Sequence, residues 1–360
     1  MKYVINPFKY VILMAGALAL FVTCTNDDHF GRSDFNEIKA FTVPGQSGAT
    51  VISKTNSTVT LTVAKGVDRT SLVPSTFEIS NFATVTPGKT VARDFTDPVE
   101  YVVRAENDSK RIWTVTIDEI GENPQLSNSD FDLWYETSAG IINPMYYEEP
   151  GESKDNTIWA TANYGLTNYG FQPNATPFDF GSDNYAVHME TVPAPIVGLA
   201  AGTIYTGVFK LDIANPAASA RFGIPFTSRP AGFRVNYVYV PETDPANLVG
   251  VDYDECDIYV LLEKREGDAV ERIATGWFRD GTETGTDSWT SLEVNLKYGP
   301  LSASDPEYAY ANIKGSETWG DPNDTPTHIS VIFSSSALGN EYKGAIGSIL
   351  VVDDFELIYE

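Results

Sequence analysis

Residues 223–241 read GIPFTSRPAGFRVNYVYVP, and the second half of this stretch alternates between two faces. Phe233, Val235, Tyr237 and Tyr239 share one face, and the residues between them share the other. A period of two is typical of a β-strand, and the proline that closes the stretch ends it. The sequence therefore predicts a strand with one aromatic face, which is either a core layer or a platform on which a ligand stacks.

The composition favours an all-β protein. The chain has 360 residues, of which 42% are hydrophobic, so it is long enough for two domains that each bury a core. Its 28 Gly, 21 Pro, 19 Tyr and 19 Phe residues suit many short strands joined by turns. The formal net charge is −25 and no run of basic residues occurs, so nucleic acid is not an expected partner.

The N-terminus predicts the compartment. Residues 1–9 carry two lysines, residues 10–22 form an apolar run, and Cys24 follows closely. The run is shorter than the roughly 20 apolar residues of a spanning helix and predicts a secretory leader. It resembles a bacterial lipoprotein signal, which implies a signal peptide over 1–23, a tether over 24–33 and outer-membrane anchorage through lipid on Cys24.

Thr25, Asn26, Asp27 and Asp28 follow this cysteine. An acidic pair at this position resembles the surface-export signal of Bacteroidetes lipoproteins, and an ordinary polar tether is the alternative. We therefore expect exposure at the cell surface.

Only one other cysteine, Cys256, is present, so a chain lipidated at Cys24 can form no internal disulfide. Cys256 lies in an alternating run, and we expect a buried thiol there.

Residues 34–120 read as short strands separated by turns. The runs 59–63, 99–103 and 113–117 each place apolar side chains on one face. Residues 106–109, Glu-Asn-Asp-Ser, lie between the last two runs and predict a hairpin turn. Roughly seven strands in such a length predict an immunoglobulin-like β-sandwich.

Two phrases of this first domain, LTVAKGVD at 61–68 and PVEYVVRAE at 98–106, carry a resemblance. They are similar to the small immunoglobulin-like domains that precede carbohydrate-binding modules in Bacteroidetes surface lipoproteins. The resemblance implies a spacer, and a ligand site of its own is the alternative.

Residues 121–127 break the strand pattern and predict a linker. Residues 128–360 then predict a second, larger all-β domain with about ten strands and loops rich in Gly, Pro, Asn and Asp. This pattern favours a jelly-roll β-sandwich. No glycine motif of the dinucleotide or phosphate-loop type interrupts it.

Seven short sequence segments of the larger domain resemble segments of a known family and occur in the same order as in that family. They are residues 128–134, 159–163, 223–230, 257–260, 334–336, 344–348 and 351–357. They resemble the putative carbohydrate metabolism domain (PCMD) family of Bacteroidetes lipoproteins. One departure is RVNY at 234–237, where we expect a Trp-Tyr-Lys character. The resemblance implies a jelly roll with a sugar-binding pocket and brings no established reaction.

Sugar recognition needs flat apolar faces and a few fixed polar groups. Candidates for carbohydrate binding are Trp134, Trp159, Tyr237 and Tyr239 as faces and Asn163 and Arg229 as hydrogen-bonding groups. Core packing is the alternative for each aromatic residue. Arg229 lies in a proline-bounded loop where sites are common, with a structural ion pair as its alternative.

Glycoside hydrolysis requires two carboxylates about 5.5 Å apart for retention, or up to about 9.5 Å apart for inversion. Asp252, Asp254 and Asp257 form an Asp-x-Asp-x-x-Asp run that distantly resembles the Glu-x-Asp-x-x-Glu strand of some jelly-roll glucanases. The first two would share a strand face, and the third would need a bulge to join them. An acidic loop entering a strand is the alternative.

Calcium is a further candidate ligand, although no cofactor is required. Asp130 or Asp132 could meet Asp353 or Asp354 where the first and last strands of the jelly roll come together, since carboxylates are preferred calcium ligands. No His or Cys cluster indicates zinc.

These observations predict a surface lipoprotein that binds an oligo- or polysaccharide in a jelly-roll pocket during polysaccharide capture or utilisation. One alternative is an enzyme of the glycoside hydrolase type. The other is an accessory subunit of an outer-membrane transporter complex for nutrient uptake.

Overall fold

The computed structural model describes residues 31–121, 123–140, 144–182, 184–194, 197–267, 269–286 and 288–359. Cys24 and the predicted signal peptide lie outside these ranges. No helix within them is long and apolar enough to cross a membrane.

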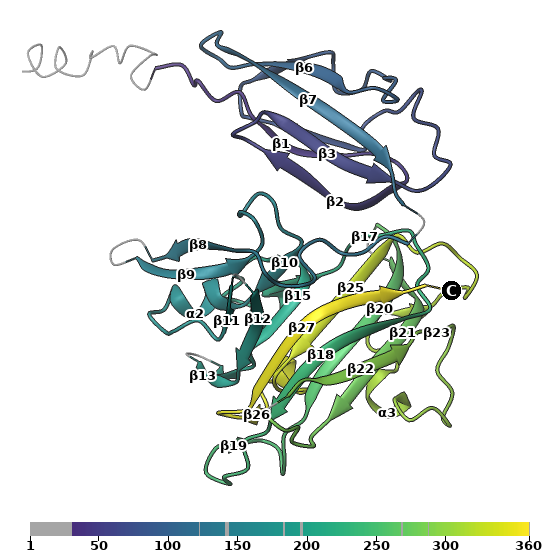
Figure 1. Cartoon of the computed structure of the whole chain (residues 1–360). Coiled ribbons are helices and arrows are strands. Elements are labelled where there is room, and N and C mark those ends of the chain that lie inside the picture. Colours follow the sequence, from purple (N-terminus) through teal and green to yellow (C-terminus); the bar gives the residue numbers. More distant parts are fainter. Residues whose placement is uncertain are drawn as a thin grey trace, which may run out of the picture.

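The N-terminal domain contains seven strands in two sheets, one of five strands and one of two (Figure 1). The sheets are β2–β3–β7–β6–β5 and β1–β4, with bounds β1 Ile38–Thr42, β2 Gln46–Ser53, β3 Thr58–Val63, β4 Thr76–Ile79, β5 Thr84–Thr86, β6 Val99–Arg104 and β7 Lys110–Glu119. Phe41, Tyr101 and Trp113 are fully buried between them. The predicted immunoglobulin-like sandwich is confirmed in its all-β, two-sheet character.

The predicted hairpin joins β6 to β7, which pair antiparallel. Asp108 adopts a left-handed φ of 69°, and the Asn107 side chain accepts a hydrogen bond from the Ser109 amide at 2.9 Å. Asn and Asp tolerate this geometry better than most residues, which explains the turn at this place.

The larger domain is a β-sandwich of two main sheets, which lie one behind the other in Figure 1. The nine-stranded sheet has the order β10–β15–β25–β20–β21–β23, with β16, β17 and β24 paired at its sides. Its bounds are β10 Trp159–Thr161, β15 Thr203–Phe209, β16 Ala220–Phe222, β17 Ile224–Pro225, β20 Cys256–Glu266, β21 Ala269–Asp280, β23 Lys297–Tyr298, β24 Thr318–Trp319 and β25 His328–Ser334.

The five-stranded sheet has the order β11–β12–β27–β18–β22, with bounds β11 Ala175–Gly181, β12 Asn184–Glu190, β18 Gly232–Val240, β22 Thr290–Asn295 and β27 Ile349–Ile358. Three two-stranded sheets complete the domain: β8 Trp134–Ala139 with β9 Met145–Pro150, β13 Val192–Ala194 with β14 Gly198–Ala200, and β19 Leu248–Val249 with β26 Gly344–Ala345. The short helices are α2 Asn163–Thr167, η1 Pro216–Ser219, α3 Tyr308–Ala311 and η2 Gly339–Glu341.

The strand predicted over 233–240 is β18, which pairs with β27 on one side and β22 on the other. Its aromatic face lies in the core, as shown by Phe233, Tyr239 and their neighbours on that face, which are almost fully buried. On the opposite face Arg234 bonds Glu293 at 2.9 Å and Glu356 at 3.4 Å. The stretch is therefore a core layer, the first of its two predicted roles.

The two domains touch through β2 and the segment around β17, which lie close together in Figure 1. The Thr227 amide donates a hydrogen bond to Ser47 Oγ at 3.2 Å, and Ala49 packs against the core of the larger domain. The Gln125 side chain also makes two hydrogen bonds with the Leu357 backbone, at 2.7 and 2.8 Å. These contacts hold the N-terminal domain against the larger domain.

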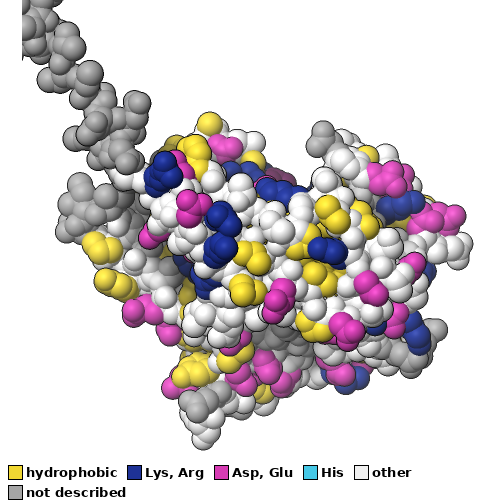
Figure 2. Space-filling model, turned by 90° about the horizontal axis from the view of Figure 1, so that it is seen from above, with side chains coloured by type: hydrophobic (Ala, Val, Ile, Leu, Met, Phe, Trp, Pro, Cys, Tyr) yellow, Lys and Arg dark blue, Asp and Glu magenta, His cyan; other side chains and the backbone are white. Residues whose placement is uncertain are grey.

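The acidic excess of the chain is dispersed on the face seen in Figure 2. Asp and Glu side chains there are interspersed with Lys and Arg side chains and with polar and apolar ones. A net charge of −25, far from zero, favours solubility.

Candidate functional site

A cleft of about 260 Å³ opens on the nine-stranded sheet, on the face turned away from the core. Ile258 and Val260 of β20 are fully buried between the sheets, so alternation turns Asp257 and Tyr259 to the other side. Ala160, Tyr205 and Ile332 form a separate small apolar cluster, and Tyr205 and Ile332 line the same cleft.

Two aromatic side chains stand at the centre of the cleft. Tyr259 of β20 and Trp277 of β21 are register partners, and their rings stack with centroids 3.7 Å apart and planes 10° from parallel. Both side chains are half-buried. Each ring covers one face of the other. Tyr259 also packs against the small apolar cluster, and Trp277 contacts Tyr310 with the ring centroids 6.2 Å apart.

A buried ion pair lies beside the aromatic pair. Both Asp257 oxygens accept hydrogen bonds from Arg279, at 2.7 Å each, and Oδ1 also accepts one from Trp277 Nε1 at 2.9 Å. Burial raises the pKa of Asp257, and the hydrogen bonds from Arg279 and Trp277 oppose that rise. The Arg279 guanidinium also stacks over Tyr310, 4.7 Å from the ring centroid. The network fixes Trp277 in one orientation.

Loops form the rim of the cleft. Exposed Lys314 lines it from the loop after α3 and exposed Asn340 from η2, and Tyr342, which follows η2 with a left-handed φ of 57°, lines it as well. Lys314 and Asn340 supply hydrogen-bonding groups at the opening. Tyr205, on the floor, is 1% exposed, and its hydroxyl has no hydrogen-bond partner among the described residues.

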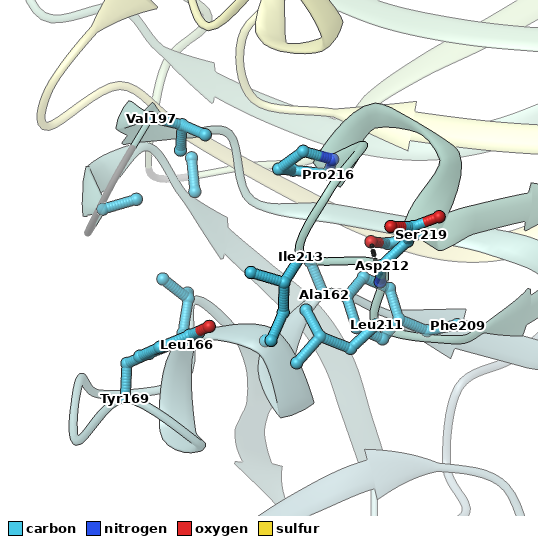
Figure 3. A pocket seen from close by; sticks show the side chains of 13 residues that line it. Ala162, Leu166, Tyr169, Val197, Phe209, Leu211, Asp212, Ile213, Pro216 and Ser219 are labelled. Carbon is cyan, nitrogen blue, oxygen red and sulfur yellow. Dashed lines mark hydrogen bonds between the residues drawn. The ribbon is translucent and has the colours of Figure 1, made fainter.

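An apolar pocket of about 140 Å³ adjoins this cleft (Figure 3). Leu166 and Tyr169 from α2 and its C-terminal turn form one side of it, and Leu211 and Ile213 from the segment after β15 form the other. We call it the apolar pocket below.

The cleft was not predicted from the sequence. Trp277 and Tyr259 lie in strands that the sequence predicts. Both strands carry apolar residues on both faces, so the sequence does not indicate which face borders a cleft. Alternation places Tyr259 on the opposite face of the strand from Ile258 and Val260, and this was the one indication in the sequence that Tyr259 faces away from the core. It does not indicate that Trp277 is its neighbour, because strand register depends on the fold.

Four of the six predicted sugar-binding side chains lie in the interior. Trp159, Tyr237 and Tyr239 are 2%, 5% and 0% exposed and pack in the main core, so the prediction of ligand-stacking faces is wrong for them. The Trp159 indole donates to the Ser127 carbonyl at 2.9 Å. These side chains belong to the core because they point toward the opposite sheet.

Asn163 is the fourth of these residues, at 0% exposure. Its Oδ1 accepts hydrogen bonds from the amides of Asn174 and Ala175 at 3.0 and 3.1 Å, and its Nδ2 donates to the Ala175 carbonyl at 2.6 Å. Its amide is therefore engaged by backbone groups and ties α2 to the start of β11. The prediction of a sugar contact is wrong here.

Trp134 and Arg229 lie nearer the surface but outside the cleft lining. Trp134 packs against the core and donates to the Phe131 carbonyl at 2.7 Å. Arg229 donates to the carbonyls of Asp324 and Pro322 and stacks over Tyr298 at 4.3 Å. Arg229 thus links two loops through backbone acceptors, in place of the predicted sugar contact or carboxylate partner.

The three candidate catalytic carboxylates point to different places. Asp252 is exposed, whereas Asp254 is buried and accepts hydrogen bonds from Ser336 Oγ at 2.6 Å and the Ala345 amide at 2.8 Å. Both line a small hollow that does not include Asp257. The run therefore enters β20 as an acidic loop, which was the alternative, and only Asp257 lines the cleft.

The candidate calcium ligands are brought into one region. Asp353 is 5% exposed, and burial together with the charges of Asp354, Asp132 and Asp130 raises its pKa to about 7. Asp354 is turned out at a bulge with a left-handed φ of 52° and bonds Asn236 at 3.1 Å. No group of three His, Cys, Asp or Glu side chains in the described ranges is placed to hold a metal. Calcium binding here stays a prediction.

Two family models match the chain. Residues 130–358 match the family described as "Putative carbohydrate metabolism domain". The chain belongs to this PCMD family. The match confirms the resemblance stated from sequence. Residues 38–117 match a second model, described as "SGBP, N-terminal", ahead of the PCMD region.

Among solved structures, a putative glycoside hydrolase from Bacteroides thetaiotaomicron is similar to this PCMD protein, with 24% identity and a TM-score of 0.55. The alignment covers 92% of this chain and 99% of that one, so the two share the whole fold. A putative glycoside hydrolase from Bacteroides vulgatus shows 20% identity and a TM-score of 0.47 over 63% of this chain and 96% of its own. No curated protein matches the chain.

Proposed function

We propose that this PCMD protein binds glycan in the cleft on the nine-stranded sheet. The observation that carries the proposal is the stacked pair of Tyr259 and Trp277 beside the ion pair of Asp257 and Arg279. Aromatic faces contact the C–H groups of a sugar ring, and charged groups pair with its hydroxyls.

The comparisons support a role connected with carbohydrate. The family is described by carbohydrate metabolism, and SGBP stands for surface glycan-binding protein. The similar chain from Bacteroides thetaiotaomicron is called a putative glycoside hydrolase. These names apply to the relatives, and the cleft supplies the chemistry by which this chain would share the role.

Capture of the glycan is favoured over its hydrolysis by the contents of the cleft. Asp257 is the one carboxylate among its described lining residues, and Arg279 holds both of its oxygens. Glycosidases need a second carboxylate at a set distance. The hydrolase alternative predicts that purified protein releases sugars from a polysaccharide mixture and that Asp257→Asn abolishes the release.

Calorimetric titration against glycans selected on an array tests the proposal, with Trp277→Ala as the main variant. Tyr146→Ala is the matched control, since Tyr146 is 65% exposed on β9 and does not line the cleft. We expect Trp277→Ala to weaken binding and Tyr146→Ala to leave it unchanged. Absence of binding to every glycan, or normal binding by Trp277→Ala, would refute it.

We also propose that lipid on Cys24 anchors the protein at the outer surface, with the N-terminal domain as the spacer that carries the cleft away from the membrane. Labelling with a radioactive fatty acid in cells, compared between wild type and Cys24→Ser, tests the anchor. Protease digestion of intact cells tests surface exposure. Co-purification with a large β-barrel complex from mild detergent is the result that an accessory transporter subunit predicts.

A further inference from the structure

The apolar pocket and the cleft are lined in part by the same residues. The residues that line both are Ala162, Val197, Ala200, Phe209 and Pro216. We infer that the ligand is a glycan bearing an apolar substituent, with its sugar against Tyr259 and Trp277 and its substituent in the apolar pocket. This inference rests on the proposed function and names the class of glycan.

The lining of the apolar pocket selects against polar groups. Apart from the hydroxyl of Tyr169, which is 39% exposed, its polar side chains are engaged locally. Ser219 Oγ accepts a hydrogen bond from the Asp212 amide at 2.9 Å, shown as a dashed line in Figure 3, and the Asp212 carboxylate accepts hydrogen bonds from the amides of Ala214 and Asn215 at 3.0 Å each. A sugar hydroxyl that entered would lose its hydrogen bonds to water without replacement. The pocket therefore fits a hydrocarbon group better than a second sugar ring.

The size of the pocket sets the size of the substituent. Its volume is about 140 Å³, and an engineered apolar cavity of about 150 Å³ in another protein binds benzene. A phenyl ring or a short acyl chain therefore fits. Both share the chemistry of an apolar group on a sugar, as in a phenolic or an acyl ester of a polysaccharide.

The rim of the pocket offers residues that can be changed without disturbing the core. Ile213 is 62% exposed and lies with Leu211 on the segment after β15. Val208, at 59% exposure on β15, lines neither hollow and is a matched control for the loss of an exposed aliphatic side chain. We would compare the double variant Leu211→Ser/Ile213→Ser with Val208→Ser, each with its thermal midpoint as a check of folding.

The probes are methyl, phenyl and hexyl glycosides of glucose, galactose, mannose and xylose, with phenol alone, measured by calorimetry. We expect the phenyl or hexyl form of at least one sugar to bind about tenfold or more tightly than its methyl form. Leu211→Ser/Ile213→Ser should remove most of this preference, and Val208→Ser should retain it. A larger gain for phenyl indicates an aromatic ester, and a larger gain for hexyl indicates an acyl ester.

Equal affinity for the three forms of every sugar that binds, or a preference that survives in the double variant, overturns the inference and leaves glycan binding intact. Binding of phenol as tight as that of the phenyl glycosides shows that the sugar contributes nothing, and then the glycan function itself fails. If no glycoside of any form binds, both are overturned.

Discussion

Tyr259 and Trp277 stack across two neighbouring strands with their ring centroids 3.7 Å apart, on the sheet face that is turned away from the core. Residues on that face of a sandwich are normally polar or covered. Here they border an open cleft, and Asp257 holds the indole through its Nε1–H. The pair is therefore preorganised for a flat ligand.

Trp277→Ala should weaken binding of the best glycan by about tenfold or more, equivalent to about 1.4 kcal/mol, because aromatic anchors at the centre of a site dominate affinity. Trp277→Phe should retain part of the affinity, since a flat ring remains. Calorimetry with both variants measures the loss. An affinity unchanged in Trp277→Ala would show that the ligand binds elsewhere.

Asp257→Leu should destabilise the fold by about 3–5 kcal/mol, because it leaves Arg279 unpaired with a side chain only 11% exposed. The double variant Asp257→Leu/Arg279→Leu should recover much of the loss. Urea denaturation measures both. As a control, removing Glu293 from its exposed pair with Arg234 should cost about 1 kcal/mol or less. Equal losses in the single and double variants would contradict a buried-pair origin.

Glu149 should make stability depend on pH. Burial raises its pKa from 4.5 to about 7, although Thr161 Oγ1 lies within 2.8 and 3.0 Å of its two oxygens. In the folded state the carboxyl holds its proton more tightly, so stability falls as pH rises from about 4.5 to about 7. Glu149→Gln should remove that fall and be more stable than wild type at pH 8.

Unfolding at pH 5 and pH 8 provides the measurement, with exposed Glu148→Gln as the neighbouring control. Parallel pH profiles for wild type and Glu149→Gln would contradict the assignment.

Asn163→Ala should destabilise the protein by about 3 kcal/mol, because it leaves the buried amides of Asn174 and Ala175 without an acceptor. Glycan affinity per folded molecule should not change, since Asn163 lies outside the cleft lining. Exposed Asn340→Ala is the stability control. Lost affinity in a fully folded Asn163→Ala protein would restore the ligand role predicted from sequence.

Calcium should raise the midpoint of thermal unfolding more than magnesium does, because a cation would relieve the repulsion among Asp353, Asp354, Asp132 and Asp130. Asp353→Asn should remove the calcium response. A midpoint that calcium leaves unchanged would exclude a structural calcium ion at this place.

Much of the fold was predictable from residue order. The alternation around Phe233 identifies a strand, and the Asn-Asp turn before Ser109 identifies the β6–β7 hairpin. Cys256 is buried as expected, and burial raises the pKa of its thiol. These features depend on neighbours in the chain, which a period of two and turn chemistry describe well.

The candidate site was predictable only in part, and Arg229 shows why. Its loop favoured a ligand contact, but its main partner is a carbonyl 95 residues away along the chain. Asn163 likewise meets backbone groups of the segment that leads into β11. Sequence pattern does not indicate such partners, because they depend on how distant segments are folded together.

Residue order alone was enough to predict an all-β chain, the alternation of its strands and its family. The tertiary structure decided which aromatic residues reach a ligand. Alternation separates the two faces of a strand, but only sheet packing determines which face becomes core and which borders a cleft. That packing buried Tyr237 and Tyr239 of the opening stretch and placed Tyr259 beside Trp277.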